Sequence, residues 1–141
     1  NAVTSCVPIG GTNLGAAINA AVRELTTRQR RGAMRAILLF TDGQPTSGMP
    51  FHADPWINAR QAAVAARDAG IPVFTIGLAQ DPVAVPGQIA ILNDTNPDPS
   101  SGGIAAISAH GATFSLVTNS AQLRSTFEKI ARCLVEIVAN G

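Results

Sequence analysis

Two short segments carry the side chains best suited to bind a ligand. Residues 10–13 read Gly-Gly-Thr-Asn and open a stretch with helical spacing, where free backbone amides attract anions. Residues 41–43 read Thr-Asp-Gly and follow the apolar run 36–40. A hard cation such as Mg²⁺ prefers carboxylate, hydroxyl and water oxygens. The hydroxyl of Thr12 and the carboxylate of Asp42 therefore form part of a candidate cation site.

Each segment also has a purely structural interpretation. Thr12 or Asn13 can cap the helix that follows, and Asp42 can cap its own turn. The glycine-rich segment lacks the Gly-Lys-Ser/Thr ending of a phosphate loop. No Gly-x-Ser-x-Gly elbow marks a nucleophile, and His52 and His110 have no partner at ligand spacing. These observations argue against a hydrolase or a nucleotide enzyme.

The elements that must position these side chains alternate along the chain. Helices are predicted at 14–25, 56–69 and 104–109 and after a cap at Asn119 or Ser120, and strands at 36–40, 71–76 and 113–117. Residues 79–103 are predicted to be loop-like, with one short helical turn at 85–92. The alternation predicts parallel strands in sequential order, with the strand 36–40 buried on both faces. Ligands of such sheets bind at the carboxyl ends of the strands, where both candidate segments lie.

Composition excludes several functional classes. Hydrophobic residues make up 46% of the 141 residues and charged residues 13%, which excludes a disordered chain. The net charge of +1, with one short basic cluster at 28–31, argues against nucleic-acid binding. No apolar run has the length of a membrane span. Cys6 and Cys133 can pair in an oxidising compartment or stay apart as small apolar residues.

Taken together, the two segments resemble the von Willebrand factor type A domain. The likeness rests on Gly-Gly-Thr-Asn opening a helix and on Ile-Leu-Leu-Phe-Thr-Asp-Gly at 37–43. Residues 72–78 are similar to a later strand of that family, and 111–114 with the last helix resemble its end. The resemblance covers nearly the whole chain, and the region 120–131 looks most like bacterial surface or pilus-assembly members of the tight-adherence type. It implies a doubly wound parallel α/β sheet with helices on both faces.

The resemblance also implies a function, a non-enzymatic adhesion module with a metal-ion-dependent site. Thr12 and Asp42 match two parts of that site, and Gly10, Gly11, Asn13 and Gly43 would support its loops. The cation would be Mg²⁺, or Mn²⁺ or Ca²⁺, and a partner protein's acidic side chain would complete its coordination. The expected location is extracellular, cell-surface or periplasmic.

One part of the family pattern has no counterpart here. The Asp-x-Ser-x-Ser segment that supplies further ligands does not occur in residues 1–141. We therefore expect a partial domain without its N-terminal strands, which alone binds metal weakly. We also expect another stretch of the gene product, or a second chain, to cover the edge of the strand 36–40. The alternative is a structural or assembly component of a cell-surface or pilus-like complex with a metal-free site.

Overall fold

The structure is a computed structural model that describes residues 11–28, 32–108 and 111–140. It contains five helices within these ranges: α1 (Leu14–Thr27), α2 (Pro55–Asp68), α3 (Val85–Leu92), α4 (Ile104–Ser108) and α5 (Ser120–Asn140). Three strands are described: β1 (Ile37–Thr41), β2 (Val73–Leu78) and β3 (Phe114–Val117). The α/β alternation expected from the sequence is confirmed. Cys6, Gly10, Arg30, Arg31 and His110 lie outside the described residues.

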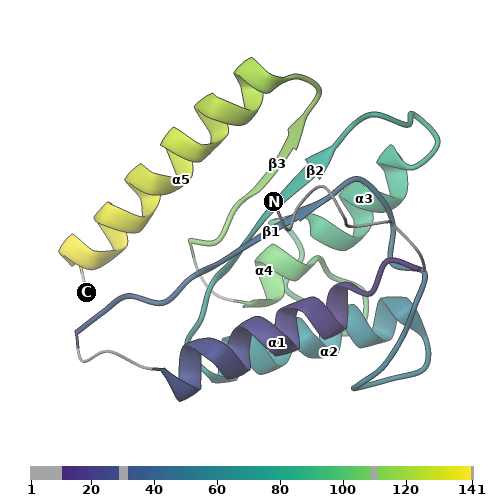
Figure 1. The fold of residues 1–141 in the computed structure, drawn as a ribbon, viewed down its shortest axis with the longest axis horizontal. Coiled ribbons are helices and arrows are strands. Elements are labelled where there is room, and N and C mark those ends of the chain that lie inside the picture. The colour runs from purple at the N-terminus through teal and green to yellow at the C-terminus, as the bar shows by residue number, and fades with distance from the viewer. Residues whose placement is uncertain (1–10, 29–31, 109–110, 141) are drawn as a thin grey trace, which may run out of the picture.

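The three strands form one parallel sheet in the order β1-β2-β3, as predicted. The β1–β2 register pairs Leu38 with Phe74 and Phe40 with Ile76, and the last pair is Thr41 with Gly77. Figure 1 shows α1 to α4 on one side of the sheet and α5 on the other. This arrangement agrees with the predicted fold class, with helices on both faces.

The core lies mainly between the sheet and the first four helices. Small alanines along one face of α2 bring that helix close to α1 and α4, and Trp56 at the start of α2 packs against the same core. On the opposite face, Ile130 of α5 is buried against Phe74, Ile76 and Val117. The sheet therefore has a thick layer on one face and a single helix on the other.

The strand predicted at 36–40 is not buried on both faces, so that part of the prediction is wrong. Ile37 and Leu39 are buried, but Leu38 is 42% and Phe40 44% exposed. Both exposed side chains share the sheet face of Phe74 and Ile76, because parallel register partners point to the same side. The single helix α5 on that face buries the central strand and leaves β1 uncovered within the described residues.

One further prediction needs correction. Residues 85–92, predicted to be one short turn in a loop, form the eight-residue helix α3. Its Ile91 and Leu92 are fully buried, so packing stabilises a helix whose proline and glycine are poor helix formers. The apolar residues of α5 are only partly covered, because Phe127 and Val138 are exposed whereas Ile130 is buried. Within the described residues, no helix combines the length and apolarity needed to cross a membrane.

Candidate functional site

The start of α1 places Thr12 at the carboxyl end of the sheet. Of the two cap candidates, Asn13 is the one that caps, and its Oδ1 accepts a 2.8 Å hydrogen bond from the Ala16 N–H. This cap satisfies one of the free amides in the first helical turn. Thr12 therefore lies just before the helix, and its hydroxyl is not used as the cap.

The segment around Thr12 is held against the loop that follows β1. The Thr12 N–H donates a 2.7 Å hydrogen bond to Thr46 Oγ1, and the Thr12 carbonyl accepts from the N–H groups of Thr46 and Ser47. A Cβ at Gly11 would overlap the side-chain hydroxyls of Thr46 and Ser47. The glycine thus allows two backbones to meet closely, which fixes Thr12 relative to residues 46–47.

The turn after β1 is stabilised by its own threonine. Buried Thr41 accepts a hydrogen bond from the Gly43 N–H at 3.2 Å and donates one to the Gly43 carbonyl at 3.1 Å. Both bonds close the turn below Asp42, whose side chain is exposed. The carboxylate is therefore accessible at the end of the strand.

Thr12 and the Thr-Asp-Gly turn are neighbours in space. A Cβ at Gly43 would lie 3.7 Å from Thr12 Oγ1, so the hydroxyl faces this turn. The structure thus brings Thr12, Gly11 and Gly43 together at the carboxyl end of the sheet, and Asn13 supports them as the helix cap. Asp42 is adjacent to Gly43 in the chain, and Gly10 lies outside the described residues.

Three supporting residues were not identified from the sequence. Asn58 is a fully buried amide on α2, Gln88 a fully buried amide on α3, and Thr46 a loop hydroxyl that receives the Thr12 amide. A polar residue within the apolar face of an alanine-rich helix was the available signal for Asn58. Gln88 gave no such signal, because its segment was not predicted to be a full helix.

The donor set suits a hard cation in kind but is small in number. Thr12 and Asp42 offer a hydroxyl and a carboxylate, which are the oxygen ligands that Mg²⁺ and Ca²⁺ prefer. Within residues 11–28, 32–108 and 111–140, no three His, Cys, Asp or Glu side chains gather as a possible metal group. Any cation held by this pair would take most of its remaining ligands from elsewhere.

The acidic residues of 79–103 are engaged in hydrogen bonds away from Thr12 and Asp42. Asp81 accepts from the Val83 N–H at 2.9 Å, and Asp94 accepts from the Phe114 N–H at 3.2 Å. At Asp98, the Ser100 N–H and then the hydroxyls of Ser101 and Ser100 hold the pKa of the carboxyl below its usual value. Asp81 and Asp98 thus stabilise their own turns, Asp94 holds its loop to the start of β3, and none of the three extends the site.

Comparison with known proteins gives one match. The family model described as von Willebrand factor type A domain matches residues 1–132. No curated protein and no solved structure matches the sequence. The match spans both candidate segments, all three strands and most of α5.

Proposed function

The chain belongs to the von Willebrand factor type A domain family, and we propose that it binds a partner protein through a metal-dependent site at Thr12 and Asp42. Domains of this family are in general non-enzymatic protein-interaction modules, commonly extracellular or surface-associated. The observation that carries the proposal is the packing of the Thr12 hydroxyl against Gly43, next to the exposed Asp42. In this proposal, the Thr12 hydroxyl and the Asp42 carboxylate act together at the end of the sheet where parallel sheets bind their ligands.

Mg²⁺ is the cation that this pair of oxygens suits, with Mn²⁺ and Ca²⁺ as alternatives. Thr12 would hold it through its hydroxyl, and Asp42 directly or through water. Gly11 would allow the close approach of residues 46 and 47, and Asn13 would keep the loop in place by capping α1. A cation with two protein ligands is mostly hydrated, so we expect weak binding by this chain alone. An Asp-x-Ser-x-Ser segment outside these 141 residues would strengthen it.

The partner is a protein that presents an acidic side chain. When bound, the cation offers an open coordination position to a carboxylate, which hard cations accept readily. The chain's own contribution is to orient the two oxygens and keep the turn rigid. We place this interaction outside the cell, at the cell surface or in the periplasm, as in surface or pilus-assembly members of the family.

Titration calorimetry with Mg²⁺ tests the metal site. We expect weak binding by the 141-residue chain, and stronger binding by any longer form that carries an Asp-x-Ser-x-Ser segment. Asp42→Ala should abolish binding in both. Asp68→Ala is the matched control, because Asp68 is an exposed carboxylate at the end of α2, just before the amino end of β2. Binding that survives Asp42→Ala would refute the site.

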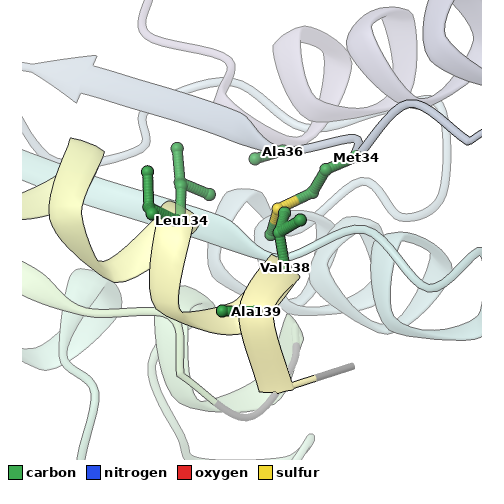
Figure 2. Close-up of a pocket in the computed structure, with 6 residues that line it drawn as sticks. Met34, Ala36, Leu134, Val138 and Ala139 are labelled. Carbon is green, nitrogen blue, oxygen red and sulfur yellow. The ribbon is translucent and has the colours of Figure 1, made fainter.

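A second function is favoured by the apolar surface beside β1. Met34, Leu38 and Phe40 are exposed, and an open groove of about 410 Å³ lies between the segment before β1 and α5. Figure 2 shows Met34 extending toward Val138 of α5, with Ala36 and Leu134 beside them. We propose that another stretch of the gene product or a second chain covers this surface and the outer edge of β1, which pairs with no strand among the described residues. The chain would then be an assembly component, and its site could remain metal-free.

The two functions separate experimentally. An assembly component without metal would keep its partner after removal of divalent cations with EDTA. A metal-dependent module would release its acidic partner under the same conditions. Asp42→Ala should cause the same release of the partner as EDTA only if the chain is a metal-dependent module.

A further inference from the structure

Gln88 connects α3 to the candidate site. Its side chain is fully buried, and its Nε2 donates hydrogen bonds to the carbonyl oxygens of Asp42 at 2.7 Å and Leu78 at 3.2 Å. A buried amide is unfavourable unless it is hydrogen-bonded, and both of these bonds go to backbone. One side chain thus contacts the ends of two strands.

These two carbonyls lie just beyond the paired part of β1 and β2. The last register pair is Thr41 with Gly77, so Asp42 and Leu78 are the next residues of each strand. Backbone carbonyls at this point lack the β1–β2 ladder and need another donor. Gln88 supplies it and so fixes the Asp42 peptide relative to the end of β2.

The other end of the Gln88 amide has no partner. Gln88 Oε1 is buried without a hydrogen bond among the described residues, and a Cβ at Gly77 would lie 3.1 Å from it. An unpartnered buried acceptor is unfavourable for stability. The benefit of this amide therefore lies in the two bonds of its Nε2 and not in filling space.

The preceding residue reinforces the same contact. A Cβ at Gly87 would overlap the side-chain amide of Gln44, so Gln44 packs directly on the α3 backbone. The first half of α3 accordingly touches the turn at both residue 42 and residue 44. Two neighbouring contacts fix the orientation of a turn better than one.

We infer that Gln88 is a positioning residue that holds the Asp42 turn, and so its carboxylate, at the end of the sheet beside Thr12. The inference that this serves binding rests on the proposed function. The positioning itself can be measured without any metal or partner. Gln88→Met removes both donors at similar side-chain length, and Ile91→Val is the control because Ile91 is a fully buried apolar residue of the same helix.

Nuclear magnetic resonance of the full chain tests the positioning. In the wild type, we expect a through-hydrogen-bond coupling between the Gln88 side-chain nitrogen and the Asp42 carbonyl carbon. In Gln88→Met, the Asp42 carbonyl and Gly43 amide resonances should shift, and hydrogen exchange of the Gly43 amide should speed up about tenfold. Ile91→Val should leave both unchanged. Equal changes in the two variants, or no coupling in the wild type, would overturn the inference.

A Mn²⁺ titration separates the positioning of the Asp42 turn by Gln88 from metal binding at the proposed site. In the wild type, Mn²⁺ should broaden the resonances of Thr12 and Gly43, and Gln88→Met should need several-fold more Mn²⁺ for the same broadening. Equal titrations would overturn the role of Gln88 in the site. If Mn²⁺ broadens neither residue in the wild type, the proposed metal site fails, and the resonance comparison alone decides whether Gln88 positions the turn.

Discussion

Asn58 of α2 donates a 3.1 Å hydrogen bond from its Nδ2 to Oδ1 of Asn13, the cap of α1, 45 residues earlier in the chain. The same Nδ2 donates to the Met49 carbonyl, and its Oδ1 accepts from the N–H groups of Phe51 and His52. One buried amide thereby joins the start of α1, α2 and the loop after β1. This loop carries the residues that hold Thr12.

We predict that Asn58→Leu destabilises the protein by about 2–4 kcal/mol, because it leaves several polar groups unpaired at a fully buried position. The free energy of unfolding, measured with urea, checks this. Gln61→Leu is the control, since Gln61 is exposed on the same helix and should change stability by about 0.5 kcal/mol or less. Similar losses in both variants would contradict the role of Asn58.

Gly15 should tolerate no side chain although it lies within a helix. Replacing glycine by alanine in a helix normally stabilises it, but a Cβ at Gly15 would overlap the Asn58 amide. We expect Gly15→Ala to lower the unfolding free energy by about 1–3 kcal/mol. Gly43→Ala, where the nearest atom is 3.7 Å away, should unfold nearly like the wild type. Thermal denaturation of both variants decides, and a stabilised Gly15→Ala would show that Asn58 can move.

The hydroxyl of Thr12, and not its size, should matter for metal binding. Thr12→Val removes the oxygen, and we expect the Mg²⁺ affinity of the full-length gene product to fall about tenfold or more. Thr12→Ser keeps the oxygen and should retain most of the affinity. Calorimetry gives both values. Equal affinities for the two variants would exclude Thr12 as a ligand.

The uncovered side of β1 should make the isolated chain associate with itself. We predict that Leu38→Thr with Phe40→Thr reduces this association, because both side chains are more than 40% exposed on an edge strand of the described sheet. Sedimentation velocity at increasing concentration measures it. Ile57→Thr, which removes a similarly exposed side chain from α2, should leave association unchanged. A wild-type chain that stays monomeric at high concentration would contradict the prediction.

The sequence alone was sufficient for much of the architecture. Apolar runs of strand length located β1, β2 and β3, and the helical spacing between them predicted their parallel, sequential order. The sequence also identified residues 10–13 and 41–43 as the candidate site, because both segments follow local rules for helix caps and turns. These features depend on neighbours within a few residues, which a sequence displays directly.

Tertiary structure decided what depends on distant residues. An apolar run has the same sequence pattern whether one or both of its faces are covered. The exposure of Leu38 and Phe40 depends on the position of α5, which covers Phe74, Ile76 and Val117 instead. Helix α3 forms because Ile91 and Leu92 pack in the core, against a weak local signal. Gln88 and Asn58 bond to backbone and side chains that the fold brings near, 46 and 45 residues away along the chain. The partners in such contacts leave no local pattern, because the free energy of these hydrogen bonds arises only in the folded chain.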